Sequence, residues 1–217
     1  EISAKALESK IDGVEATGSG VSGGLVALSG VGIGIYNTVA NTILTDISGP
    51  VHLIAGGDIH VLSGENAWVS GDAATLSIAV GLGGAVGVAK VHNTIGGTVT
   101  TQVHGNSNTS TTFNAANILI SADAKAIIFT TNTAGIAASL VGVQENVSRA
   151  AISTVLKTDV NQVGINATGA VDVNSTGTFT ANTLSKGASG GVAAIGGMYA
   201  VVSLGGGTSV NEVEAIL

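Results

Sequence analysis

The amino-acid sequence predicts an all-β protein, a parallel β-solenoid built from repeats of about 55–60 residues. Three observations support this prediction. A pair of apolar residues four apart recurs along the chain, large and small residues alternate with a period of two, and no stretch of ten or more residues has a helical pattern. Self-similarity at a fixed period is the signature of solenoids, and period-two alternation is the signature of strands. We therefore expect parallel, in-register coils.

The recurring pair divides the chain into a single repetitive segment of four approximate repeats, residues 1–47, 48–103, 104–156 and 157–217. The pairs are Ile43 with Ile47, Val99 with Val103, Ile152 with Leu156, and Val213 with Leu217. Side chains alternate across a strand. We therefore expect these residues to form the core, with the residue after the first member of each pair pointing outward.

An asparagine stands six residues ahead of the first three pairs, at Asn37, Asn93 and Asn146, and Gly207 takes this place in the fourth. Asparagine side chains bond to the backbone of turns and form ladders when they stack. We expect these three residues to lie at a repeated corner of the solenoid.

The alternating stretches precede and separate these pairs. In residues 74–92, large residues occupy the even positions from Leu76 to Val88 except Gly84, with glycine, alanine or serine between them. Similar runs cover residues 20–36, 133–143 and 187–204. A membrane-spanning helix is the competing interpretation, but the abundant glycine and the missing aromatic belt oppose it. Short strands joined by corner turns predict two or three coils of roughly 20–30 residues in each repeat, and an antiparallel stack of hairpins is the alternative.

Composition favours the same architecture. Only 10% of the residues are charged and 3% are aromatic, while 33 are glycine. Valine, isoleucine and alanine suit narrow stacked strands. The formal charge is −7, and the seven basic residues are scattered, which argues against nucleic-acid binding and against attraction to anionic lipid. We expect no cofactor.

The unit at residues 83–99, GGAVGVAKVHNTIGGTV, followed by a turn and a strand such as residues 116–122, resembles the leukotoxin-type filamentous adhesins. These are large repetitive exoproteins related to filamentous haemagglutinin. The resemblance covers essentially the whole chain through its small-residue texture and spacing. It implies a β-helical shaft, export by an outer-membrane partner in a two-partner secretion system, a bacterial cell-surface or secreted location, and a role in adhesion or fibre formation.

The sequence predicts no catalytic residues and no metal site. His52, His60, His92 and His104 lack the spacing of converging ligands, and Gly56-Gly57-Asp58 is a single partial echo of calcium-binding nonapeptide repeats. Acids and bases pair locally only at Lys157 with Asp159 and at Arg149 with Glu145. We expect ordinary surface pairing at both.

The leading functional prediction is a structural shaft segment of a large fibrous adhesin, and not an enzyme. Its expected partners are neighbouring repeats or subunits, joined end to end because the chain begins and stops within its own pattern, and host or bacterial surface receptors or glycans. A carbohydrate-active β-helix enzyme is the alternative. An ice-binding protein, suggested by Thr98/Thr100 and Thr178/Thr180, and a membrane-active β-protein are further alternatives.

Overall fold

The computed structural model describes residues 2–5, 9–106, 111–205 and 213–216, of which the first and last ranges are described for their backbone alone. In these ranges the chain is 89% strand and has no helix, and its parallel strands wind nearly closed around an axis. The protein is a parallel β-solenoid. This confirms the predicted fold class.

The described residues form twelve strands, which differ greatly in length. They are β1 (Ile2–Lys5), β2 (Ser9–Ser48), β3 (His52–Ile54), β4 (Ile59–His104), β5 (Thr111–Ala115), β6 (Ile118–Ala138), β7 (Val141–Asn161), β8 (Val163–Ala167), β9 (Val171–Ala181), β10 (Leu184–Gly190), β11 (Ala193–Leu204) and β12 (Val213–Ile216). The longest, β4, has 46 residues, because it continues through a turn and includes two sides of one coil.

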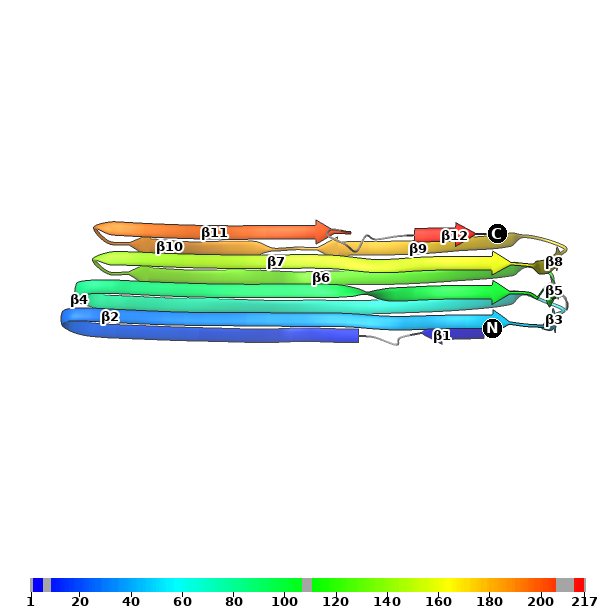
Figure 1. Cartoon of the computed structure of the whole chain (residues 1–217), viewed down its shortest axis with the longest axis horizontal. Helices are drawn as coiled ribbons and strands as arrows, with labels where there is room; N and C mark the ends of the chain where they lie inside the picture. The colour runs from blue at the N-terminus through cyan, green and yellow to red at the C-terminus, as the bar shows by residue number, and fades with distance from the viewer. Residues whose placement is uncertain (1, 6–8, 107–110, 206–212, 217) are drawn as a thin grey trace.

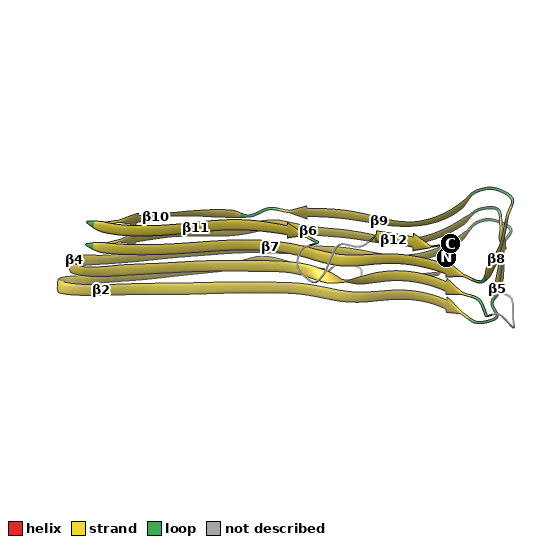
Figure 2. Ribbon diagram, turned by 45° about the horizontal axis from the view of Figure 1, so that its top comes forward, coloured by secondary structure: helices red, strands yellow, loops and turns green. Residues whose placement is uncertain are grey.

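Each coil is a flattened loop with two long sides and one short side (Figure 1). The chain runs out along β6, turns at one end and comes back along β7; β2 and β4 each make both passes. We call the layers the outgoing and return sheets, and the end where the chain turns the rim. The opposite end, the base, carries the short strands β3, β5 and β8, which form a parallel sheet of their own. Figure 2 shows these strands closing the base.

One repeat makes one coil. Ile43 is paired with Val99, and Ile59 is paired with Ile118, so the chain advances by one whole repeat between paired positions. The prediction of two or three coils in each repeat is therefore wrong. Glycines such as Gly84 and Gly96 lie inside a long strand, because glycine also suits a strand where another backbone approaches closely.

The rim itself depends on glycine. Gly24 and Gly81 adopt positive φ angles of 149° and 126°, a region that L side chains rarely occupy. A Cβ atom on Gly81 would lie 1.8 Å from the Gly24 carbonyl oxygen in the neighbouring coil. These glycines therefore let successive turns stack directly on each other.

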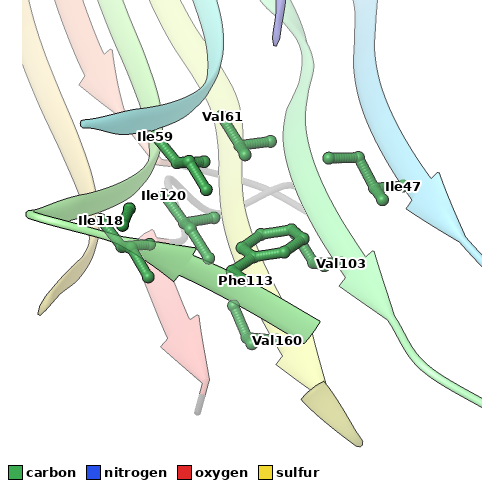
Figure 3. Packing of buried hydrophobic residues seen from close by; sticks show 9 residues of the cluster. Ile47, Ile59, Val61, Val103, Phe113, Ile118, Ile120 and Val160 are labelled. Carbon is green, nitrogen blue, oxygen red and sulfur yellow. The ribbon is translucent and has the colours of Figure 1, made fainter. Parts of the chain in front are cut away.

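The interior near the base is a conventional apolar core. Phe113 on β5 is fully buried among Ile118, Ile120, Val61 and Val103 (Figure 3). Two further clusters, built around Ile95 with Ile152 and around Val99 with Leu156, extend the core along the coils. We call this part of the molecule the base half.

Polar and small residues fill much of the interior between this core and the rim. Gln144 and Asn146 on β7 are buried and joined by a hydrogen bond of 2.7 Å from Gln144 Nε2 to Asn146 Oδ1. Glycines face them, since Cβ atoms on Gly135 and Gly187 would lie 2.1 and 2.3 Å from these two side chains. Buried Ser77 and Thr133 continue this polar lining in what we call the tip half.

Candidate functional site

The residues predicted to form the core point inward where the structure describes their side chains. Ile43 and Ile47 are 8% and 7% exposed, and Val99, Val103, Ile152 and Leu156 are fully buried. Leu44, which follows Ile43, is 50% exposed, as strand alternation requires. The Val213 side chain and the whole of Leu217 lie outside the described residues.

The register corrects the alignment of the third and fourth repeats. Val99 is paired with Leu156 rather than with Ile152, and the backbone of Val213 is also paired with Leu156. The boundary predicted after residue 156 therefore falls four residues too early relative to the boundary after residue 103. Ile152, Leu156 and Val160 all point inward and are four apart, so the apolar pattern fits equally well after a shift of four residues.

Asn37 and Asn93 form a ladder, but they lie within strands rather than at a corner. Both are buried on the return sheet, and Asn37 Nδ2 donates to Asn93 Oδ1 at 2.9 Å. Each amide also reaches across the interior to a carbonyl of the outgoing sheet, Ser70 O at 3.1 Å and Thr130 O at 2.9 Å. These carbonyls adjoin β-bulges, where the registers of β2, β4 and β6 shift. The two side chains thus satisfy backbone groups at irregular points of the ladder.

Asn146 does not belong to this ladder. The strand pairing places it beside Ala89, whereas Asn93 is paired with Ala150. Its Nδ2 instead donates to the Lys186 carbonyl, and its Oδ1 accepts from Gln144. The same shift of four residues that misaligned the apolar pairs explains this error.

A hollow with a volume of about 350 Å³ lies on the outer face of the outgoing sheet. It crosses three coils, with Gly64 and Asn66 on β4, Asp123 and Lys125 on β6, and Thr176 and Thr178 on β9 among its lining residues. Gly64 is paired with Asp123 and supplies no side chain, which creates the depression. The hollow therefore presents amide, carboxylate, ammonium and hydroxyl groups together.

Two aromatic residues stand on the same sheet beside this hollow. Trp68, the only tryptophan of the chain, is two residues from Asn66 on the same strand face, and Phe129 is the bulged residue of β6 and is 64% exposed. Both line a second hollow of about 230 Å³ with Asp12. The Lys10 ammonium lies 5.4 Å from the Trp68 ring and 3.0 Å from the Asp12 carboxylate. Hydrogen bonding from Ser70, together with Lys10, lowers the pKa of Asp12.

Two buried polar atoms at this site have no hydrogen-bond partner, Asn66 Oδ1 and Trp68 Nε1. An acceptor and a donor that leave water without a partner carry a desolvation cost. Both atoms are shielded from solvent, beneath the surface that carries the hollow and the aromatic rings. Sequence reasoning missed this cluster, because only the register places residues a whole repeat apart side by side.

Other titratable groups pair across coils or sit apart. Asp159 contacts Lys157 at 3.3 Å and His104 at 3.4 Å, and Glu145 contacts Lys90 of the neighbouring coil at 3.6 Å. Glu65 is buried in the interior, where desolvation raises its pKa against a 2.7 Å hydrogen bond from Asn41 Nδ2. Within the described ranges, no group of three histidine, cysteine or acidic side chains converges as a metal site.

The threonine pairs do not extend into ranks across the coils. Thr98 and Thr100 are aligned with Thr42 and Leu44 on one side and with Val155 and Lys157 on the other. Thr178 and Thr180 are aligned with Lys125 and Ile127. An ice-binding surface needs a regular flat array of threonine, so the register disfavours that alternative.

The chain matches no protein-family model, no curated protein and no solved structure. Among the residues that the structure describes, no helix is long and apolar enough to span a bilayer.

Proposed function

We propose that the chain is a structural shaft segment of a large, secreted or cell-surface bacterial fibre of the adhesin type. The observation that supports this proposal is the in-register parallel stacking of coils of nearly equal length, with sheet edges at both ends of the described stack. Within the described residues, the return half of β2 pairs only with β4, and β11 pairs only with β7. Such edges present backbone donors and acceptors to a further coil.

The dimensions of one coil give the expected shape of this shaft. Its long sides of some twenty residues span about 70 Å, and each coil adds about 4.8 Å along the axis. Stacking of many coils therefore produces a flat ribbon rather than a thin rod. This scaffold supports attachment or cell–cell and cell–matrix contacts, with export through an outer-membrane partner, as the resemblance to filamentous adhesins implies.

The test blocks the open edge at β11. The Ala193 and Gly205 amides donate toward the preceding coil, so the alternate amides, including that of Ala200, face the free edge. The substitution Ala200→Pro removes one outward donor and places its ring where another coil would pair, while the bonds to β7 remain. Ala200→Ser is the matched control.

We expect electron microscopy of the chain to reveal ribbons that lengthen with protein concentration. Fibre diffraction of these ribbons should give a reflection near about 4.8 Å along the axis. Ala200→Pro should shorten or abolish them without a change in circular dichroism, whereas Ala200→Ser should leave them unchanged. Discrete monomers at all concentrations, or equal ribbons from both variants, would refute end-to-end stacking.

A second candidate function is glycan attachment at the outgoing face, supported by the hollow beside Trp68 and Phe129. Aromatic rings stack on the apolar faces of sugars, while carboxylate, amide and hydroxyl groups bond to sugar hydroxyls. We expect a glycan array probed with this chain to give signals that fall at least tenfold in Trp68→Ala. Tyr199→Ala, on the opposite sheet, serves as the control, and equal losses in the two variants would rule out this site.

A further inference from the structure

In the tip half, apolar residues face outward, while the interior holds both polar side chains and small apolar ones such as Ala79 and Ala137. On the return sheet, the paired residues form ranks that run across all four coils, one residue from each. The two ranks nearest the rim hold only apolar residues and glycine: Leu28, Gly84, Val141 and Ala193 in the first, and Gly30, Val86, Val143 and Ile195 in the second. The facing interior contains buried polar side chains such as Gln144 and Ser77.

The outgoing sheet has a similar arrangement, with one serine among the apolar residues and glycine. Its two outward ranks nearest the rim hold Val21, Ile78, Ala138 and Gly190, followed by Ser19, Leu76, Ile136 and Ala188. The rim itself adds Leu25, Leu82 and Val192, which are 85%, 60% and 87% exposed. We call these ranks on both sheets, together with the rim, the apolar edge.

The exposure of this edge does not result from missing neighbours in the stack. Leu76 and Val86 on β4 are each paired with residues of the coils on both sides. They nevertheless remain 37% and 45% exposed. Contiguous apolar surface of this kind is rare on soluble monomers and marks an interaction surface.

Charged and aromatic residues bound the apolar edge at a similar depth on both sheets. On the return sheet, the next three ranks contain Glu145, then Lys90 and Tyr199, then Tyr36, His92 and Arg149. On the outgoing sheet, the next two ranks contain Lys186, then Glu15 and Asp72. Both tyrosines of the chain thus lie at this boundary, and they are 66% and 58% exposed. Tyr199 and Tyr36 lie two and four residues beyond the rank of Glu145, and amphipathic aromatic side chains close to such a boundary are typical of a membrane–water interface.

The shape of the edge selects its occupant. A second protein copy docks on one face, whereas this surface continues over the rim onto both faces. A fluid hydrocarbon phase can cover both faces and the rim at once. Backbone pairing between adjacent coils satisfies the peptide groups of the inner coils, as hydrocarbon requires. The open edges at β2 and β11 are satisfied where further coils of the proposed shaft stack on them, so this inference rests on the proposed function. From Gly81 to the rank of Glu145 is about seven residues, or about 23 Å, which matches half of a bilayer about 40–45 Å thick with its headgroups.

We propose that the apolar edge inserts into the outer leaflet of a lipid bilayer, with Glu145 and Lys186 at headgroup level and Lys90 and Tyr199, then Tyr36, successively farther from the membrane. The chain then lies edge-on in one leaflet, as a monotopic protein does, and successive coils extend the inserted line along the membrane. Since the net charge is −7, insertion relies on apolar contact and favours zwitterionic over anionic lipid.

Vesicle flotation tests this proposal with outward substitutions at equivalent strand positions. Val86→Asp places a charge in the apolar edge, and Thr98→Asp places the same charge on the outer face of the same strand in the base half. We expect the unaltered chain and Thr98→Asp to float with phosphatidylcholine vesicles. Val86→Asp should lose at least tenfold of its vesicle-bound fraction while its circular dichroism is retained. Equal loss in both variants, or no flotation of the unaltered chain, would overturn the proposal.

Insertion depth provides an independent readout. In a Trp68→Phe background, the fluorescence of Val86→Trp should be quenched by lipids brominated on their acyl chains, whereas that of Thr98→Trp should not. Light scattering without vesicles tests whether a second copy of this chain covers the apolar edge instead. Dimers that Val86→Asp dissociates, combined with no bromolipid quenching, would assign the edge to a second copy of this chain. Ribbon formation is measured separately, on protein without vesicles. Failure of the shaft proposal can therefore be told apart from failure of the membrane proposal.

Discussion

The base half and the tip half share the same strands but are stabilised in different ways. In the base half, Phe113, Ile95 and Val99 are fully buried, and apolar burial holds the sheets together. In the tip half, Gln144, Asn146 and Ser77 are buried, while Leu82 and Val80 face outward. Backbone pairing between coils is common to both halves. The stacked strands therefore determine where side chains point, whereas the local sequence determines whether each face is polar or apolar.

The largest expected effect comes from placing the same charge once in the base half and once in the tip half. Val99→Asp buries an unpaired carboxylate in the base core and should cost more than about 4 kcal/mol, which is enough to unfold many domains. Val86→Asp, at a position that is 45% exposed, should cost within about 1 kcal/mol. Urea denaturation followed by circular dichroism measures both, and similar losses would contradict the assigned polarity of the two halves.

Removing a large ring should have the next largest effect. Phe113→Ala leaves a cavity in the base core and should lower the free energy of unfolding by about 3–5 kcal/mol. Phe129→Ala, on the outer face, should change it by less than about 0.5 kcal/mol. Comparison of the two urea midpoints checks this. A small effect at Phe113 would mean that the short side of the coil contributes little to stability.

A smaller effect is expected where the two halves meet. Asn93→Ala removes the partner of the Thr130 carbonyl and of the Asn37 amide, which should cost about 1–3 kcal/mol. Asn132→Ala, on the outer face, is the control and should stay within about 0.5 kcal/mol. Hydrogen exchange of the amides near the bulges should quicken only in Asn93→Ala, and a uniform increase would argue against a local role.

The smallest effect concerns the buried carboxylate of Glu65 in the interior of the base half. Because burial raises the pKa of Glu65 above its ordinary 4.5, the folded protein binds this proton more tightly than the unfolded chain. Its contribution to stability is therefore fully present below pH 4.5 and is lost as the pH rises through the raised pKa.

We expect Glu65→Gln to be more stable than the unaltered chain at pH 7 and to lose that advantage toward pH 4. Urea midpoints of both proteins, measured from pH 4 to pH 8, test the sign, because the other titrating groups are common to both. A constant difference across this range would mean that Glu65 is not the source.

The sequence was sufficient to predict the fold class but not the register. Period-two alternation identifies strands and their inward positions, so Ile43 and Val99 could be assigned to the interior. A pattern in which Ile152, Leu156 and Val160 all recur at four residues is unchanged by a shift of four, and it therefore cannot align the repeats. The hollow beside Trp68 depends on that register, since it brings together Asn66, Lys125 and Thr178 from three coils.

The stepped outline of the rim bears on how such a protein changes over evolutionary time. Between equivalent paired positions, the turn contains five residues in the coil of β4, from Ala79 to Gly83, but two in the next coil, Ser139 and Leu140. Both lengths are accommodated with the flanking register intact, although inserting a single residue within a strand would exchange its two faces. The rim is thus where insertions and deletions are tolerated. The length of the long sides can therefore vary from repeat to repeat while the pairing between coils stays the same.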